Sequence, residues 1–478
     1  MEKLFKLKQN GTNVRTEILA GITTFMTMAY IIALNPNLLT GFGNDGGPAL
    51  WNGVFLATCI ASGIAMICMA FLANKPFALA PGMGLNSFFA VVVGNIAAMT
   101  STSYLVSFQA TLCIILIEGI LFIILSVLSV REKIVDAIPV GVRNGIAPAI
   151  GIMLMNIGLG SNAGVFGKDG ATFYALRDFF GSLTPKTIAT TMSEAGADYR
   201  AMVLTVATMF VGLFVMVILS KKKVKGSVLI GMLVASVVYW ASQFIFFGVN
   251  PFASLATASF VPPFADLANT TLFKFDFATL LDIGWFTVIT LVITFCMIDM
   301  FDTIGTFVGA AARGGMLDKD GKMPKMREAL LSDAVGTVAG ACTGTSTVTT
   351  FVESASGIEQ GGRTGLTALT TGILFLACMF IAPIAAIIPS PATSSALIYV
   401  GILMISGLKN IDWDDMDQVV PVALMLIAMP ISSSIGHAIG IALISYTIIK
   451  VFSGKPKDVS VLTYIISLLF LIKFFLIV

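Results

Sequence analysis

Long apolar stretches, separated by short polar gaps, follow one another along almost the whole chain. A helix needs about 20 apolar residues to cross the hydrocarbon of a bilayer. Stretches that approach this length lie at residues 16–38, 52–74, 78–98, 104–130, 134–160, 199–219, 226–248, 279–311, 325–343, 346–361, 364–388, 393–408, 417–433 and 437–453. The pattern predicts an all-α polytopic membrane protein with about 14 transmembrane segments. A further apolar segment at 459–478 either crosses the membrane or lies at its surface.

The predicted spans form two sets of seven that resemble each other. The first set covers residues 16–248 and the second covers 279–453. Gly151 opens the run Gly-Ile-Met-Leu-Met in the fifth span of the first set, and Gly401 opens Gly-Ile-Leu-Met-Ile in the fifth span of the second. Because seven is odd, the second set starts from the opposite side of the membrane. We therefore predict an inverted repeat, which many secondary transporters use for alternating access.

Composition agrees with a surface that faces lipid. Of the 478 residues, 57% are hydrophobic and 11% are charged, and the mean hydropathy is +0.94. Soluble domains carry roughly a quarter charged residues, so we expect no separate soluble domain. The formal net charge of +2 is too small to indicate nucleic acid or another acidic partner.

Basic residues gather on one side of the predicted topology. Lys75, Arg131, Lys133 and Lys221–Lys225 lie in gaps on the same side as the N-terminus, whereas the outer loop 39–51 contains no Lys or Arg. Cytoplasmic loops carry an excess of Lys and Arg. The start of the chain is polar and basic, which does not match a cleaved signal peptide. We therefore predict a multi-pass protein of the cell membrane with its N-terminus in the cytoplasm.

The third span of each set is interrupted by polar or helix-breaking residues. In the first set Pro81 and Gly82 interrupt the span, and in the second a polar run covers Thr343–Thr350. Unsatisfied backbone and hydroxyl groups are costly in lipid, so both segments are expected to be strand-like pieces that give way to half-helices. Pro81 with Gly82 suits the start of one half-helix, and Ser346 or Thr345 could cap the other. Such helix N-termini would offer N–H donors to a polar solute, although Gly and Ser also mark tight helix packing.

Acidic residues lie at membrane depth. Asp299 and Asp302 are three residues apart and share a helix face, and Glu353 follows the polar run. Intramembrane carboxylates typically line aqueous pathways or relay protons, and burial favours their neutral form, which makes proton loading feasible at neutral pH. The alternative is a structural role, in which a carboxylate bonds the broken backbone of a neighbouring half-helix. Phe351, next to the polar run, is placed to stack on a flat ligand.

No cofactor or metal is expected from the sequence. The cysteines, Cys59, Cys68, Cys113, Cys296, Cys342 and Cys378, lie in apolar segments without the spacing of a metal site. They are expected to be small core residues rather than ligands or disulfides.

At these residues the sequence resembles the adenine/guanine/hypoxanthine permeases, the AzgA-like branch of the nucleobase–cation symporters in the xanthine/uracil permease family. The stretches that carry the resemblance are Gly21–Tyr30, Ala80–Asn86, Asp299–Thr306 and Gly344–Gly357. They lie in both halves, so the likeness covers nearly the whole chain. The resemblance implies a core domain formed by spans one to four and eight to eleven, and a gate domain formed by the others.

The resemblance also implies which residues bind the substrate. They are the carboxylates of the eighth and tenth spans, here Asp299, Asp302 and Glu353, and the asparagine of the third span, Asn86. Related uracil permeases have Glu and His where this chain has Asp302 and Thr306, which favours purines over uracil. The full candidate set for substrate binding is Glu353, Asp299, Asn86, Phe351, Thr350 and Gly84, and that for proton coupling is Asp302, Asp299 and Glu353.

These observations predict a transporter, not an enzyme, that imports adenine, guanine or hypoxanthine by proton symport. Its expected partners are the purine base, H⁺ and the lipid bilayer, and the resemblance suggests a homodimer through the gate domain. A same-fold transporter of another solute, of uracil or xanthine, or of an anion is an alternative, although an anion would require a positive site. An intramembrane aspartyl protease is a remote alternative, because its two Asp come from different helices whereas Asp299 and Asp302 share one.

Overall fold

The helices of the first repeat follow the predicted apolar stretches. The computed structural model describes residues 2–41, 46–128, 138–162, 199–313, 315–316, 323–432 and 435–476. After a short helix α1 (Glu2–Phe5), this repeat contains α2 (Val14–Met28), α3 (Ile31–Leu39), α4 (Gly47–Cys68), β1 (Leu79–Pro81), α5 (Met83–Thr100), α6 (Tyr104–Val127), α8 (Val140–Ile157), α12 (Tyr199–Lys221) and α13 (Ser227–Phe247). Arg131 and Lys133, which were used to predict the orientation, lie outside the described residues.

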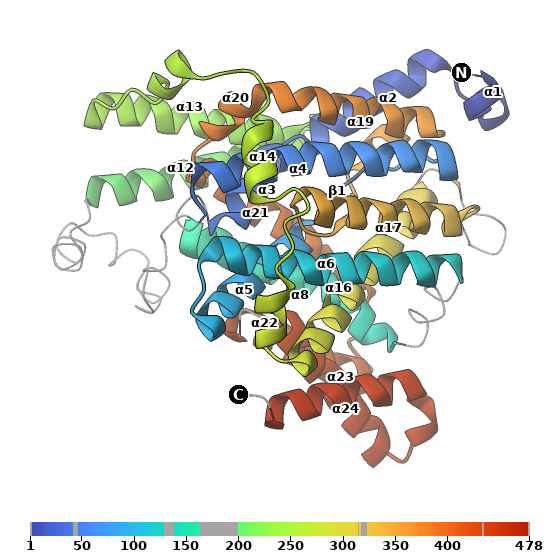
Figure 1. The fold of residues 1–478 in the computed structure, drawn as a ribbon. Coiled ribbons are helices and arrows are strands. Elements are labelled where there is room, and N and C mark those ends of the chain that lie inside the picture. The colour runs from blue at the N-terminus through green and yellow to red at the C-terminus, as the bar shows by residue number, and fades with distance from the viewer. Residues whose placement is uncertain are drawn as a thin grey trace.

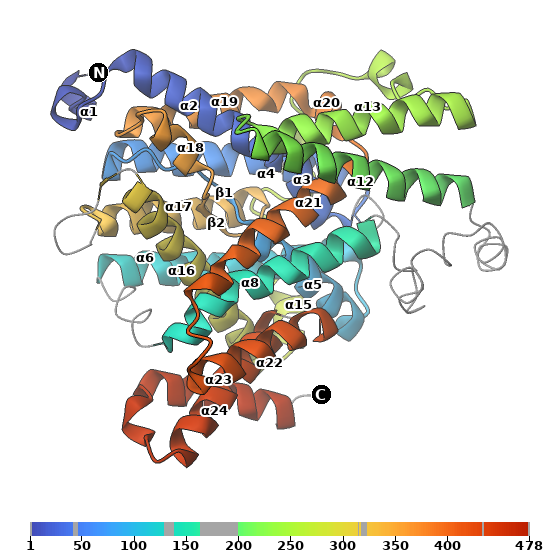
Figure 2. The same cartoon turned by 180° about the vertical axis from the view of Figure 1, so that it is seen from behind.

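The second repeat has the same organisation. Two short helices, α14 (Phe264–Thr270) and α15 (Phe277–Asp282), connect it to the first. It contains α16 (Trp285–Arg313), α17 (Met326–Thr343), β2 (Val348–Thr350), α18 (Ser354–Glu359), α19 (Gly365–Ala377), α20 (Ala382–Ala386), α21 (Ser390–Ile405), α22 (Met416–Ser432) and α23 (Ile435–Phe452), and α24 (Val461–Leu476) follows. Within the described residues, eleven helical stretches are long and apolar enough to cross a bilayer. Most lie side by side with their axes roughly aligned (Figures 1 and 2). This arrangement confirms a polytopic helical membrane protein.

Two predicted spans are broken into separate helices. The span predicted for 279–311 begins later than expected, because α15 ends at Asp282 and α16 begins only at Trp285. Gly284 lies between them with φ 85°, and a glycine in this left-handed conformation ends a helix at little steric cost. The first span consists of α2 and α3, with Ala29 and Tyr30 between them.

Helix α17 occupies the interior rather than the lipid-facing surface. It packs between α4 and α6, as both views show (Figures 1 and 2). Its Asp333 is completely buried. A carboxylate at this depth is tolerated because neighbouring helices shield it from lipid and supply hydrogen-bond partners.

Equivalent helices of the two repeats meet directly. Helix α8 packs against α21, and the matched glycines of these helices touch each other. A Cβ on Gly151 would lie 2.5 Å from the carbonyl oxygen of Gly401, and a Cβ on Gly401 would lie 2.5 Å from the carbonyl oxygen of Gly151. Both positions therefore require glycine, and the contact has the reciprocal form expected for an inverted repeat.

The C-terminal helix α24 lies alongside α23 and also contacts α16. In both views it runs parallel to the spanning helices (Figures 1 and 2). Its Phe470 ring packs on Gly440, where a Cβ would come within 2.7 Å of the ring. The hydroxyls of Thr447 and Ser467 share a hydrogen bond of 3.0 Å. Helix α24 therefore packs as a further member of the helix bundle.

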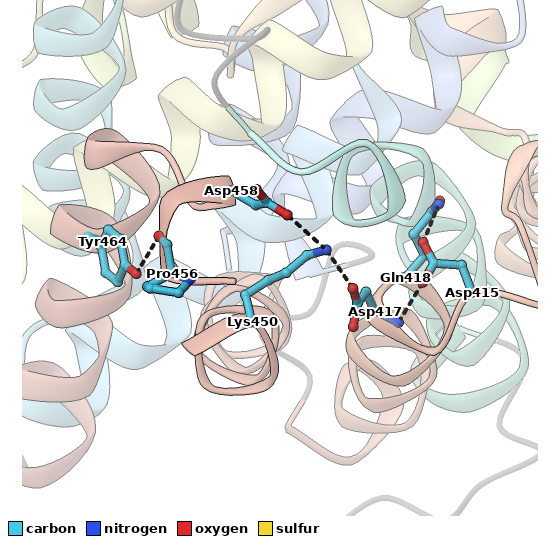
Figure 3. A network of polar contacts seen from close by, with 7 residues as sticks. All are labelled: Asp415, Asp417, Gln418, Lys450, Pro456, Asp458 and Tyr464. Carbon is cyan, nitrogen blue, oxygen red and sulfur yellow. Dashed lines mark hydrogen bonds and ion pairs between the residues drawn. The ribbon is translucent and has the colours of Figure 1, made fainter. Parts of the chain in front are cut away.

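A polar network joins the ends of α22, α23 and α24 (Figure 3). The Lys450 ammonium group, near the end of α23, forms ion pairs with Asp417 at the start of α22 and with Asp458 in the turn before α24. The Tyr464 hydroxyl donates to the carbonyl oxygen of Pro456 at 2.9 Å. These bonds fasten the turn that leads into α24 to the neighbouring helix pair.

Packing groups the helices into two sets. Helix α8 packs against α21 and α22, and α12 and α13 pack against α21, while α6 and α4 pack against α17 and α2 packs against α19. A core domain and a gate domain that move relative to each other remain a prediction.

Candidate functional site

Strands β1 and β2 form a small antiparallel sheet where the interrupted third spans of the two repeats cross. Leu79 pairs with Thr350, Ala80 with Thr349 and Pro81 with Val348. The ladder continues on both sides, since the Phe351 amide donates to the carbonyl of Ala78 at 3.0 Å and the Gly82 amide donates to that of Thr347 at 3.1 Å. The sheet therefore satisfies backbone groups that would otherwise be unsatisfied inside the membrane.

The start of the second half-helix differs from the prediction. Helix α5 begins at Met83 with Gly82 at the N-cap, as predicted, but α18 begins at Ser354 with Glu353 at its N-cap position. Neither Ser346 nor Thr345 caps α18, so that prediction is wrong. β-Branched residues favour extended backbone, and the threonines of the polar run pair with β1 before a helix can start.

Asn86 joins the first half-helix to the polar run of the second repeat. Its amide nitrogen donates to the carbonyl of Pro81 at 3.2 Å, and its Oδ1 accepts from the Ser346 hydroxyl. Both Asn86 and Ser346 are completely buried. In this structure, the amide nitrogen and the amide oxygen of Asn86 are therefore both used in hydrogen bonds at the crossing, and the bond from Ser346 joins its two segments.

A hydrogen-bond network centred on the Thr303 hydroxyl lies between β2, α16 and α17. The Thr303 hydroxyl is 3.0 Å from Oδ1 of Asp299, 3.0 Å from Oδ1 of Asp333 and 2.6 Å from the Thr349 hydroxyl. A hydroxyl has one proton, so it can donate to one of these groups at a time. The network ties α16, α17 and β2 together through two buried carboxyl groups.

Asp333 was missed by the sequence analysis. The signal was present, because it is an acidic residue within the predicted span 325–343. Asp333 is close in sequence to Arg327 and Glu328, so it resembled part of the charged end of that span.

Another buried carboxyl group that bonds the crossing is Glu118 of α6. It accepts from the Thr347 hydroxyl at 2.7 Å.

Asp302 and Glu353 are partly exposed, whereas Asp299 is completely buried. The Asp302 carboxyl faces Gly82, with its Oδ2 at 3.6 Å from the position that a Cβ would occupy there. It lies within electrostatic range of both Asp299 and Glu353. Glu353 accepts a hydrogen bond of 2.9 Å from the Tyr30 hydroxyl. The structure thus gathers all three predicted carboxylates at the crossing.

The remaining candidate residues also lie next to the sheet. Phe351 is 6% exposed and Thr350 is 2% exposed. Within the part of the chain that the structure describes, the Thr350 hydroxyl has no hydrogen-bond partner. Gly84 packs against Ile150 of α8, so it lies at the contact between the two packing sets. Direct contact of these three residues with a substrate stays a prediction.

Comparison with known proteins identifies the family. The model of the Permease family matches residues 15–197 and 186–443. The chain is 35% identical to the adenine permease AdeP of Escherichia coli (strain K12), over 99% of this chain and 95% of that protein. It is 36% identical to the guanine/hypoxanthine permease PbuG of Bacillus subtilis (strain 168), over 99% of each chain.

Solved structures of other transporters share the fold. The transmembrane domain of the cyanobacterial bicarbonate transporter BicA superposes with a TM-score of 0.62 at 15% identity, covering 90% of this chain and 97% of that one. The structure of SLC26A9 gives a TM-score of 0.61 at 10% identity, covering 92% of this chain and 66% of that one. Fold and sequence comparisons agree with the resemblance noted in the motifs. The chain therefore belongs to the Permease family of xanthine and uracil permeases, in the branch of the adenine and guanine/hypoxanthine permeases.

Proposed function

We propose that this protein imports purine nucleobases, namely adenine, guanine or hypoxanthine, by proton symport. The observation that carries the proposal is the gathering of Asp299, Asp302 and Glu353 at the β1–β2 crossing of a family member. Relatives that match over nearly their whole length are named adenine and guanine/hypoxanthine permeases.

The chemistry of the crossing suits a purine base. A purine is flat and neutral, with N–H donors and ring acceptors along one edge. The Glu353 carboxylate can accept from a ring or exocyclic N–H, and the Thr350 hydroxyl is without a partner in the described structure. Phe351 can cover the flat face of the ring. In a dry site one missing hydrogen bond is costly, so such a set of groups can select among bases.

The proximity of the carboxyl groups supports the proposal of proton coupling. Asp302 lies within electrostatic range of Asp299 and Glu353. Carboxylates this close cannot all be charged without repelling one another, so a proton bound to one of them stabilises the group. We propose that Asp302, Asp299 and Glu353 share this role, and that the proton enters with the base.

Alternating access would arise from movement of a gate domain (spans five to seven and twelve to fourteen) against a core domain (spans one to four and eight to eleven). In this proposal the protein lies in the cell membrane with its N-terminus in the cytoplasm, and two copies associate through their gate domains. Transport of an anion is disfavoured because the carboxylates at the crossing would repel it.

The decisive experiment is uptake of radiolabelled bases in cells that lack their own purine permeases. Each unlabelled base serves as competitor, and bicarbonate serves as an anion control. We expect purine uptake that falls when a protonophore collapses the proton gradient and that is insensitive to Na⁺ removal. Uptake that persists with protonophore but stops without Na⁺ would exclude proton coupling, and no purine uptake at all would exclude the proposed substrate.

A further inference from the structure

Tyr30 lies in the first span, in the short connection between the end of α2 and the start of α3. Its side chain is completely buried. The hydroxyl donates to Oε1 of Glu353 at 2.9 Å, across a sequence separation of 323 residues. A buried tyrosine normally places its hydroxyl on a partner, and here the partner is the residue proposed above as the main ligand of the base.

Glu353 holds the N-cap position of α18, but its side chain makes no capping hydrogen bond. Its carboxylate therefore does not satisfy the free N–H groups of the first turn of α18. Tyr30 occupies Oε1, and a carboxylate has a second oxygen with its own acceptor positions. Fixing one oxygen sets the direction in which Oε2 points.

The backbones that carry the two residues are held together along α2. A Cβ on Gly357 of α18 would come within 2.7 Å of the carbonyl oxygen of Ala20, so α18 lies directly on α2. Further along, the Glu17 carboxylate accepts from the Arg363 amide at 2.8 Å and from the Thr367 hydroxyl at 2.6 Å. Close backbone packing therefore fixes the distance between Tyr30 and Glu353.

We infer that Tyr30 is a positioning residue that orients the Glu353 carboxylate toward the base. This inference rests on the proposed function, since it assumes that Glu353 accepts from the base. A free glutamate side chain loses rotamer freedom when it binds a ligand, and a side chain already held by a charge-assisted bond has less to lose. Tyr30 thus raises affinity without touching the base.

Replacing Tyr30 with phenylalanine removes one oxygen atom and keeps the buried ring. We expect Tyr30→Phe to raise the Kd for the base in detergent, and the KM for uptake, by about three- to tenfold. The maximal uptake rate and the amount of protein in the membrane should stay at wild-type values. A tyrosine needed only for folding would instead lower the maximal rate and the amount. Tyr104→Phe is the matched control, because the Tyr104 hydroxyl donates to the carbonyl of Leu39, away from the carboxylates.

A double-mutant cycle with Glu353→Gln tests whether Tyr30 acts through Glu353. We expect the double variant Tyr30→Phe/Glu353→Gln to bind the base no more weakly than Glu353→Gln alone. Wild-type affinity in Tyr30→Phe, or losses that multiply in the double variant, would overturn the positioning role. Wild-type affinity in Glu353→Gln would instead remove Glu353 from the site and refute the proposed ligand itself.

Discussion

The three carboxylates at the crossing differ in how accessible each one is to a ligand. Asp299 is completely buried and bonded by Thr303, whereas Asp302 and Glu353 are partly exposed. A carboxylate enclosed by protein hydroxyls is suited to holding a proton or a helix contact. A partly exposed one can also meet a ligand, and Glu353 and Asp302 are therefore the better candidates for direct contact.

Glu353→Gln should weaken binding of the base by about ten- to a hundredfold, because losing a charge-assisted hydrogen bond in a dry site costs roughly 1.5–3 kcal/mol. Glutamine keeps the shape but presents a competing donor. Glu353→Asp should have a milder effect, since the charge is retained one methylene further back. Calorimetric titration in detergent measures both. Glu359→Gln, at the exposed end of the same short helix, is the control and should bind normally.

Asp299 and Asp302 should respond differently to substitution by asparagine. Asp299→Asn places an amide donor against the Thr303 hydroxyl and removes a buried proton site, so we expect uptake to be lost while the protein stays in the membrane. Asp302→Asn should chiefly raise the KM, by about tenfold. Kinetics of base uptake separate these effects, with Asp282→Asn in exposed sequence as control. Near-normal uptake in both variants would show that the acids are structural.

The sequence was sufficient to pick out the acids but not their partners. Asp299, Asp302 and Glu353 are conspicuous because each is a charge in an apolar context. Tyr30 is one apolar-flanked aromatic among many, and its role becomes visible only when the fold brings Glu353 to it from 323 residues away. The bond between Asn86 and Ser346 is likewise set by strand pairing, which local sequence does not encode.

At the scale of single elements, the breaks in the third and tenth spans were predictable and their boundaries were not. Pro81 cannot be accommodated inside a helix without breaking or kinking it, so the sequence alone places an interruption at Pro81 and Gly82. The run from Thr343 to Thr350 is compatible with a cap, a loop or a strand, and the choice depends on β1 as a pairing partner. Because that partner comes from the other repeat, the start of α18 could not be located from the sequence.

The β1–β2 crossing leaves no room for a side chain at Gly82. A Cβ there would collide with Cγ2 of Thr349, so Gly82→Ala must displace the Thr349 side chain or the strand that carries it. We expect loss of base uptake and a loss of stability of about 1–3 kcal/mol from overpacking. Gly94→Ala is the matched control on the same helix, because nothing lies within 4 Å of its Cβ position. Thermal unfolding in detergent and uptake assays distinguish the two, and normal uptake by Gly82→Ala would contradict the geometry.

At the scale of the whole molecule, the number and inversion of the repeats were predictable, but the placement of the last segment was not. Apolar composition suits a spanning helix and a surface helix equally. Packing supports a place in the bundle, since Phe470 lies on Gly440 and Ser467 bonds Thr447. That α24 crosses the membrane stays a prediction.

The position of α24 predicts a membrane topology for its two ends. With the N-terminus in the cytoplasm, the turn before α24 is cytoplasmic and the far end of α24 faces outside. In a cysteine-free background, Lys457→Cys should react only with a reagent admitted to the cytoplasm, and Phe475→Cys should react from outside. Both positions are exposed. Labelling of both from the same side would show that α24 lies along the surface instead.

Gly151 and Gly401 touch in the way that one residue touches its own copy across a two-fold axis between identical subunits. A gene for a single repeat, inserted into the membrane in both orientations, would produce such a pair, and fusion of two copies would join the halves for good. Pro81 and Gly82 now stand in one half at the place where threonines and Glu353 stand in the other. The halves are alike at the contact between Gly151 and Gly401. They differ at the β1–β2 crossing, where the proposed base, a molecule with no two-fold axis, would sit.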